Sequence, residues 1–164
     1  MRTLTAALAL GGIVLMATST RAGNLAPATE ELLQSSSYIY VATQRQDGEL
    51  GSFSPIWFMY VDGKLFFTTS PTSWKAKRIA AGSPLYIWVG AEDGPFLEGT
   101  AEPVTDAAFI DRMGARYAEK YWIAWLGLFK PRSTRVADGR TVAYLVTPTR
   151  VAADAAPASP RDGE

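Results

Sequence analysis

Six short runs of aromatic and β-branched residues, separated by turn signals, constrain the fold of this chain more than any other feature. They lie at residues 38–43, 52–61, 65–69, 85–89, 96–104 and 141–146. Asp-Gly pairs follow the first two runs and precede the last, as expected where tight turns join consecutive strands. The pattern predicts a mainly β (α+β) fold. A six-stranded antiparallel β-barrel with flanking helices is favoured, and a two-sheet sandwich is the competing architecture.

Helices are expected outside these runs. Residues 27–33 resemble a helix start with acids in the first turn, and Ser73 is the expected N-cap of a short helix that ends before Gly82. The longest helix is expected at residues 106–120, capped by Thr105. Its core-facing stripe consists of residues four apart, namely Phe109, Met113, Tyr117 and Tyr121. Pro55 lies inside the second run, which predicts a sheet edge or a bulge there.

The composition fits one domain and excludes several functions. A chain of 164 residues that is 48% hydrophobic can bury one sizeable core. Sixteen acidic and sixteen basic residues balance, and no basic stripe follows a nucleic-acid backbone, so nucleic-acid binding is not expected. With no His and no Cys, the chain has no Ser-His-Asp or Cys-His catalysis and no His- or thiolate-bound zinc. No metal site is expected, and redox chemistry would need a bound organic cofactor.

Both ends of the chain differ from this domain. Residues 1–22 have one arginine, a short apolar segment and a small-x-Ala ending, which predicts a secretory signal peptide; a buried N-terminal helix is the alternative. We therefore expect a periplasmic or secreted protein, not attached to a membrane once the signal peptide is removed. Residues 152–164, rich in Ala, Pro and charge, are predicted to be disordered.

A polar stretch follows the third run. Hydroxyl side chains occupy Thr68, Thr69, Ser70, Thr72 and Ser73, and three cations follow them at Lys75, Lys77 and Arg78. A strand that leads into a hydroxyl-rich loop and then into cations suits a bound phosphate. An ordinary strand–turn–helix with solvated lysines explains the same residues equally well, because such loops recur on many folds.

Several segments together resemble the FMN-binding split barrels, the pyridoxamine 5′-phosphate oxidase-like proteins, which include relatives that use a deazaflavin coenzyme. The segments are T-x-R-x-D-G at 43–48, P-I-W-F at 55–58, D-G-K-L-F-F-T-T-S at 62–70, S-W-K-A-K at 73–77, G-T-A-E-P-V-T-D at 99–106 and T-P-T-R-V at 147–151. Each is weak alone, but their order and spacing agree with the family. The resemblance implies a split-barrel domain within residues 23–151.

The resemblance also implies a cofactor site. The segment that contains Ser54, Pro55, Ile56 and Trp57 would run along the isoalloxazine ring. Thr68, Thr69 and Ser70 would lie by the ribityl chain and phosphate, while Ser73, Trp74 and Lys75 would form the phosphate clamp. The family often has Ser-Arg-Lys at this clamp, so this chain lacks a bidentate arginine there. Either Lys77 or Arg78 compensates, or FMN binding is weaker or the ligand is a different one.

Trp74 and the later residues allow two interpretations each. Trp74 either stacks on a ring or packs against the barrel, and packing is favoured. Members of the family are usually homodimers with flavin at the subunit interface. Four aromatic residues suit such an interface, namely Trp57, Trp122, Trp125 and Phe129. For Trp57, a position in the core is an equally good interpretation. The basic loop, which contains Lys130, Arg132 and Arg135, is expected to be solvated. The alternative is that it reaches the cofactor of the partner subunit or an anionic substrate.

Three functions remain open at this stage. The first is an exported homodimeric FMN-binding oxidoreductase that passes hydride or electrons to a small organic acceptor. The second is the same barrel with the deazaflavin coenzyme, whose longer acidic tail would need Lys77, Arg78 and the basic loop. The third is a non-catalytic flavin-binding module. No catalytic acid or base can be named from the sequence, and the absence of histidine argues against the pyridoxamine phosphate oxidase reaction itself.

Overall fold

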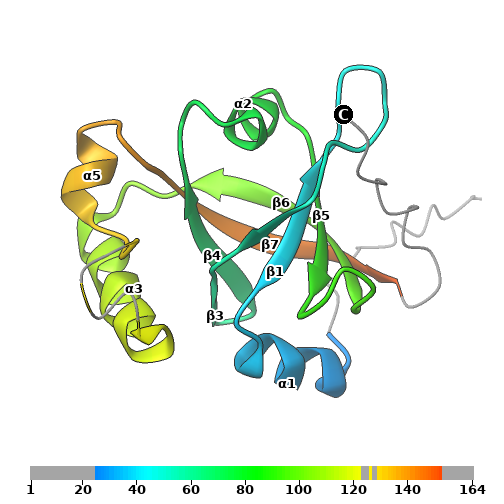
Figure 1. Cartoon of the computed structure of the whole chain (residues 1–164), viewed down its shortest axis with the longest axis horizontal. Coiled ribbons are helices and arrows are strands. Elements are labelled where there is room, and N and C mark those ends of the chain that lie inside the picture. Colours follow the sequence, from blue (N-terminus) through cyan, green and yellow to red (C-terminus); the bar gives the residue numbers. More distant parts are fainter. Residues whose placement is uncertain (1–24, 123–125, 127–128, 153–164) are drawn as a thin grey trace, which may run out of the picture.

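The computed structural model describes residues 25–122, 126 and 129–152 (Figure 1). The predicted signal peptide at 1–22 and residues 153–164 of the predicted tail lie outside these residues. Within the described part of the chain, no helix has both the length and the apolar character needed to cross a bilayer.

The described residues form seven strands and four helices. The strands are β1 (Ile39–Thr43), β2 (Ser54–Ile56), β3 (Met59–Val61), β4 (Lys64–Thr69), β5 (Leu85–Val89), β6 (Phe96–Pro103) and β7 (Val142–Ala152). The helices are α1 (Pro27–Ser35), α2 (Trp74–Ala80), α3 (Ala107–Lys120) and α5 (Ser133–Ala137).

All seven strands belong to one antiparallel sheet with the order β2-β1-β5-β6-β7-β4-β3. Its two edge strands, β2 and β3, are neighbours in the chain and are joined by Trp57 and Phe58 alone. The sheet therefore curls until its edges lie near each other, and it stays open between them. Figure 1 shows this curled sheet with α3 and α5 together on one side, α2 above it and α1 below. The predicted split barrel with flanking helices is confirmed.

The strand count differs from the expected six because the run at 52–61 does not form a single strand. It divides into β2 and β3, and residues 57–58 leave the sheet to cross from one edge to the other. Pro55 lies in β2, opposite Tyr40, at the edge position that a proline requires. The last strand is longer than predicted and continues past Pro148, opposite a register shift between Glu98 and Gly99.

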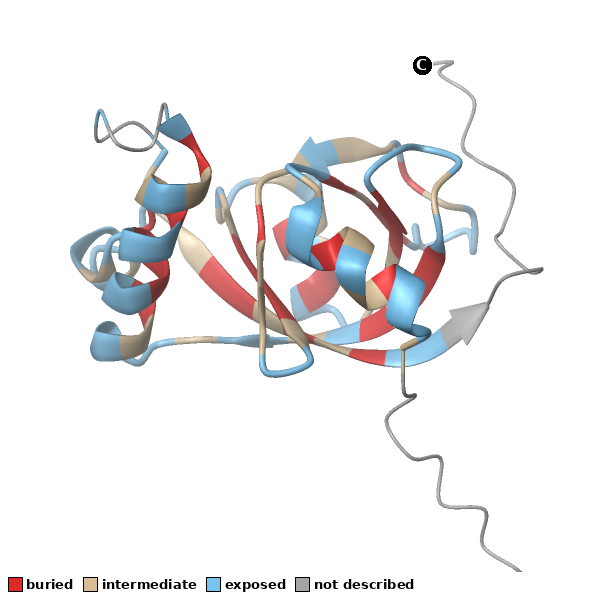
Figure 2. Ribbon diagram, turned by 90° about the horizontal axis from the view of Figure 1, so that it is seen from below, coloured by how far each residue is buried: buried red, intermediate tan, exposed pale blue. Residues whose placement is uncertain are grey.

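The apolar residues of β4 are buried on both faces of the sheet, which explains their unbroken run in the sequence. Leu65 and Phe67 belong to the cluster inside the curled sheet, and Phe66 faces the opposite side, where α3 covers it. Figure 2 shows that buried residues follow the strands while the outward faces of the helices are exposed. As predicted, α3 turns Met113 and Tyr117 towards the core. Its N-cap is Asp106, which accepts a hydrogen bond from the Phe109 amide, and the expected Thr105 cap is wrong.

Candidate functional site

The loop between β4 and α2 carries a connected set of hydroxyl groups. Ser73 caps α2 as predicted: its Oγ accepts from the Ala76 amide at 3.1 Å and donates to the Ser70 carbonyl at 2.8 Å. The Thr69 hydroxyl lies 3.3 Å from that of Ser73. The Ser70 hydroxyl lies 2.8 Å from that of Thr72. The hydroxyls are thus held in place by the loop itself, and we refer to residues 68–73 as the hydroxyl rim.

The hydroxyl rim borders a cavity of about 800 Å³. Its lining residues come from β1, β2, β4, α2, α3, the loops next to these elements and the segment 129–141. They are Tyr38, Thr43, Ser52, Ser54, Pro55, Ile56, Trp57, Thr68, Thr69, Ser70, Ser73, Trp74, Lys75, Arg78, Tyr117, Phe129, Lys130, Pro131, Arg132, Arg135 and Thr141. All of the site residues expected from the sequence line this cavity, except Lys77. Their role in binding a cofactor remains a prediction.

Lys75 points into the cavity from α2. Its Nζ donates a hydrogen bond to the Val41 carbonyl of β1 at 3.1 Å. Burial, and secondarily the charge of Arg78, lower the pKa of Lys75 from 10.5 to about 8. An incoming anion would relieve both effects, because it offers the ammonium group a charge partner.

Arg78 is the second cation that α2 contributes to the cavity, one turn after Lys75. Its Nη1 lies 3.4 Å from the Thr43 hydroxyl, and its guanidinium lies against Gly51, where a Cβ would overlap it. The spacing of three residues already places Lys75 and Arg78 on one helix face. This helical spacing is the sequence signal that favours Arg78 over Lys77 as the cation that compensates for the missing clamp arginine.

Lys77 lies on the outer side of α2, whereas Trp74 borders the cavity and is also largely exposed. The Trp74 side chain is 70% exposed, so the favoured interpretation that it packs against the barrel is wrong. The Lys77 Nζ lies 4.7 Å from the centre of the Trp74 ring. Trp74 and Arg78 also border a second groove of about 860 Å³, which α2 forms with the turn at 44–47 and which Lys77 lines.

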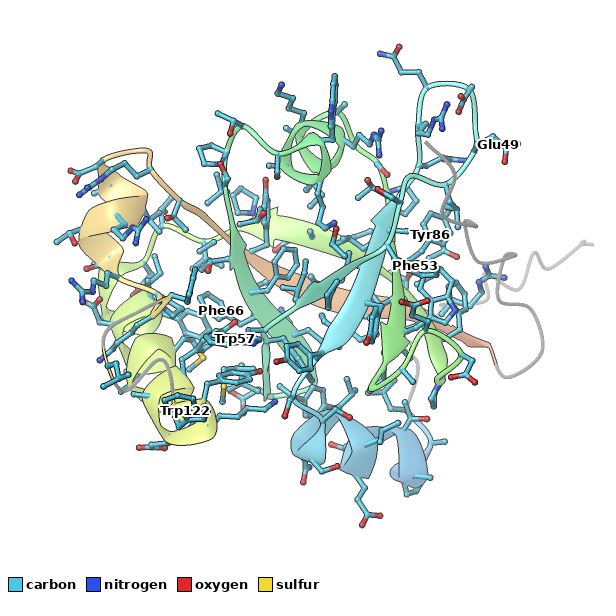
Figure 3. All side chains as sticks on the ribbon, viewed as in Figure 1. Glu49, Phe53, Trp57, Phe66, Tyr86 and Trp122 are labelled. Carbon is cyan, nitrogen blue, oxygen red and sulfur yellow. The ribbon has the colours of Figure 1, made fainter. Side chains whose placement is uncertain are left out.

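The opposite end of the cavity is aromatic. The Trp57 ring stacks on the Tyr121 ring with centroids 4.5 Å apart and planes 6° apart. The Phe129 ring meets Trp57 edge-on at 5.8 Å. Figure 3 shows Trp57 and Phe66 between the sheet and α3, with Trp122 near the end of that helix. Trp57 is thus partly buried and also faces the cavity, so neither simple expectation, core or interface, describes it fully.

The basic loop borders the cavity from the side of α3 and α5. Lys130, Arg132 and Arg135 all line the cavity, although Arg132 and Arg135 are exposed as expected. The loop is fixed to α3 by a close approach: the Pro131 carbonyl lies where a Cβ on Gly114 would be. This contact brings together residues that are adjacent only after folding.

Hydrogen bonds to Asp111 of α3 fix the start of α5 as well. The Ser133 amide donates to this carboxylate at 3.0 Å, and the Ser133 hydroxyl donates to it at 2.8 Å. These two bonds hold the pKa of the Asp111 carboxyl below its usual value. The basic loop is therefore attached to α3 on both sides of Arg132.

The charges around the cavity have one sign. Among the described residues, its lining contains five cationic side chains and no Asp or Glu, although the whole chain has a net charge of zero. The residues that the structure describes contain no group of three or more His, Cys, Asp or Glu placed to hold a metal ion. The arrangement suits an elongated ligand that is anionic along one part and planar along another.

Comparisons with known proteins agree with this architecture. An F420 reductase of known structure is 25% identical, with a TM-score of 0.52, and the match covers 75% of this chain and 94% of that one. A candidate pyridoxamine 5′-phosphate oxidase from Listeria innocua is 12% identical, with a TM-score of 0.56 and coverage of 76% of this chain and 94% of that one. A conserved hypothetical protein from Mycobacterium tuberculosis is 19% identical, with a TM-score of 0.58 and coverage of 78% and 83%.

A search of curated protein sequences found no significant match. The family model described as pyridoxamine 5′-phosphate oxidase matches residues 25–153, which include every strand of the sheet and every residue that lines the cavity. The chain therefore belongs to the pyridoxamine 5′-phosphate oxidase-like family, a flavin-related family of oxidoreductase type.

Proposed function

We propose that this protein is an oxidoreductase that binds a flavin-type coenzyme in the cavity between the hydroxyl rim and Trp57. The observation that carries the proposal is the lining formed by the described residues. Five cations and the hydroxyl rim, with no carboxylate among these residues, continue into an aromatic end. A flavin-type coenzyme has a matching shape, with a phosphoryl group at one end and a planar ring at the other.

The residues present fit such a coenzyme. The hydroxyl rim and Lys75 would hold the phosphoryl group, because hydroxyls donate hydrogen bonds to it and the ammonium supplies charge. The segment from Ser54 to Trp57 would lie along the ring. When bound, the coenzyme supplies the hydride or electron chemistry, as it does in flavoenzymes generally.

The protein's own contribution is then binding, orientation and exclusion of water. In the part of the chain that the structure describes, the cavity lining includes no carboxylate to act as a general base. The hydroxyl of Tyr117 already donates to the Trp57 carbonyl at 2.7 Å, so it stabilises the backbone at the aromatic end of the cavity. Trp57 and Phe129 cover the ring end with apolar surface, which limits access of water to the reacting atoms.

Of the two coenzymes, the deazaflavin form is the one that the charge distribution favours. One phosphoryl group needs the hydroxyl rim and Lys75, and Arg78, Lys130 and Arg135 are further cations of the lining that suit a longer acidic tail. The similarity to an F420 reductase supports the same choice. FMN, which has a single phosphate and no acidic tail, is the second candidate because it fits the hydroxyl rim equally well.

The deciding experiment is a titration of the purified protein with FMN and, separately, with the deazaflavin coenzyme F420. We expect micromolar or tighter binding, with F420 bound more tightly than FMN, and hydride exchange between the bound coenzyme and an added acceptor. Tight binding without any turnover would support a non-catalytic binding module. If neither coenzyme binds at micromolar protein, the proposed function is wrong.

We also propose that the protein acts as an exported homodimer. The exposed apolar side chains of Trp122, Leu126 and Phe129 support a partner surface near the end of α3; Trp125 lies outside the described residues. Light scattering of the purified protein should give twice the mass of one chain. Mass spectrometry of protein recovered from the periplasm or the medium should find an N-terminus near Gly23, and an intact N-terminus in the cytoplasm would contradict export.

A further inference from the structure

The two residues between β2 and β3 leave the sheet, so their backbone groups need other partners. The end of α3 supplies these partners. The Tyr117 hydroxyl donates to the Trp57 carbonyl at 2.7 Å, and the Phe58 amide donates to the Tyr121 hydroxyl at 3.0 Å. The Phe58 carbonyl has the Lys120 Nζ at 3.3 Å and the Tyr121 hydroxyl at 2.9 Å. One turn of helix thus fixes the peptide that joins the two edges of the sheet.

Tyr121 makes the largest number of these contacts. Its side chain is only 6% exposed, and its hydroxyl also lies 2.9 Å from the Ser37 carbonyl, so that a single phenol group links three segments of the chain. Its ring stacks on Trp57 with nearly parallel planes. Burial raises the pKa of Tyr121 to about 12, so the hydroxyl keeps its proton at neutral pH and continues to donate.

Tyr121 does not line the cavity, but Trp57 does. The stacked ring defines the plane of the indole, and the bonds to Phe58 define the backbone that carries it. Without Tyr121, Trp57 would keep only the edge-on contact with Phe129 among its ring contacts in the described structure. The position of Trp57 at the aromatic end of the cavity therefore depends on Tyr121, which lies behind it.

We propose that Tyr121 is a positioning residue for the coenzyme ring, acting through Trp57, with Lys120 and Tyr117 supporting the same peptide. This inference rests on the proposed function, because it concerns the ring end of the same cavity. It assigns a role to the end of α3, which the sequence suggested only as part of a core-facing stripe.

The test compares Tyr121→Phe with Tyr60→Phe in the full-length protein. Tyr121→Phe keeps the stacked ring and removes the hydroxyl that holds Phe58. Tyr60→Phe removes a phenol hydroxyl that bonds Glu30 at 3.2 Å and lies away from the cavity, so it is a matched control. The dissociation constant of the coenzyme and the position of its visible absorption band are measured for both variants and the wild type.

We expect Tyr121→Phe to weaken coenzyme binding about fivefold and to shift the visible band, because the ring environment changes. Tyr60→Phe should stay within about twofold of the wild type, with the band unmoved. A loss of stability alone would not move the band of the coenzyme that remains bound. An unchanged affinity and band in Tyr121→Phe, or equal effects in both variants, would overturn the proposal.

Two further measurements keep the test decisive. If Tyr121→Phe does not fold, Lys120→Met replaces it, since this variant removes the bond to the Phe58 carbonyl with little change in bulk. We expect about a twofold loss of coenzyme affinity and a band shift in the same direction. No change in either quantity would overturn the proposal.

If the wild type binds neither FMN nor F420, the proposed function fails. Near-ultraviolet circular dichroism of the free protein then still decides whether Tyr121 orders Trp57. The part of the spectrum that is lost in Trp57→Phe is the signal of Trp57. This signal should be weaker in Tyr121→Leu than in the wild type, and an undiminished signal would contradict the positioning.

Discussion

The two ends of the cavity are built in different ways. The hydroxyl end comes from one continuous stretch, residues 68–75, in which the end of β4, a capped loop and the start of α2 follow one another. The aromatic end comes from residues that are far apart in the chain. Tyr117 contacts the Trp57 carbonyl across 60 positions, and Tyr121 contacts the Ser37 carbonyl across 84 positions.

This difference separates local chemistry from tertiary assembly. The hydroxyl end needs chiefly a strand, a cap and a helix face, which depend on neighbouring residues, although Lys75 also donates to the Val41 carbonyl of β1. The aromatic end forms only after the sheet has curled and α3 has packed against it. We expect substitutions at the hydroxyl end to affect binding with little effect on the fold, and substitutions at the other end to affect both.

The largest effect is expected for Lys75→Ala. It removes the only lysine that reaches the cavity from α2, and a charge-assisted contact to phosphate is lost with it. Coenzyme affinity should fall by at least about tenfold, measured by absorbance or fluorescence titration. The thermal midpoint should change little, because the Lys75 side chain pays a desolvation cost in the free protein.

Lys77→Ala is the matched control on the same short helix. Lys77 lies over the outer face of Trp74 and lines only the second groove, so its removal should alter affinity by less than about twofold. Equal losses in the two variants would mean that the effect is general electrostatics. An unchanged dissociation constant for Lys75→Ala would move the phosphate site away from the hydroxyl rim.

Much of the fold and one end of the site could be predicted from the sequence. The strand runs, the edge position of Pro55 and the Ser73 cap each depend on local propensity or on the chemistry of one residue, and all three are found. The break at residues 57–58 was missed because an unbroken apolar run carries no signal for it. Its cause is tertiary: Tyr117, Lys120 and Tyr121 replace the hydrogen bonds of the ladder.

The basic loop illustrates the same limit at the site. Its three cations were expected to be solvated, because a charged loop with Pro and Ser normally is. They line the cavity because Gly114 allows Pro131 to approach α3 and Asp111 binds Ser133, and neither contact has a local signature. Arg78 differs, since its helical spacing from Lys75 was visible in the sequence and only the choice between it and Lys77 was open.

The second prediction concerns the charge of the basic loop. In the double variant Lys130→Gln with Arg135→Gln, affinity for F420 should fall about fivefold, since each exposed charge contributes on the order of 0.2–1 kcal/mol. Affinity for FMN should fall less, because FMN lacks the acidic tail. The double variant Arg112→Gln with Arg116→Gln removes the same charge from the exposed face of α3, outside the cavity lining. Equal losses for FMN and F420 would contradict the role of the loop in binding a tail.

The third prediction tests the attachment of that loop to α3. In Gly114→Ala, the added Cβ would overlap the Pro131 carbonyl, so the loop has to shift. Alanine gains roughly 1 kcal/mol of helix propensity over glycine, but we expect the overlap with backbone to outweigh this gain. The thermal midpoint should fall and F420 affinity should drop about threefold. A more stable protein with unchanged affinity would show that the loop is not held by this contact.

The smallest effect expected is the pH dependence of binding at the hydroxyl end. With a pKa of about 8, Lys75 is mostly protonated at pH 7 and half protonated at pH 8. The coenzyme phosphate favours the charged form, so affinity should be nearly full at pH 7 and below and decline as the pH rises through 8. Between pH 7 and pH 8 the loss should be about twofold. Lys75→Arg keeps its charge throughout this range, and its affinity should therefore be flat.

The stability of the free protein should respond to pH in the opposite direction, which separates the two ends of the cavity once more. Lys75 and Lys120 both have pKa values of about 8 in the folded protein, below the value of 10.5 in the unfolded chain. Between about pH 8 and 10 the unfolded chain therefore holds more protons than the folded protein. The free energy of unfolding rises with pH in this range as a result. Lys75→Met should remove part of this rise together with the pH dependence of binding. Lys120→Met should remove part of the rise and leave the pH dependence of binding intact. If Lys120→Met also makes coenzyme affinity independent of pH, the charges at the two ends of the cavity are coupled. The two ends would then differ in how they are assembled but would not be electrostatically independent.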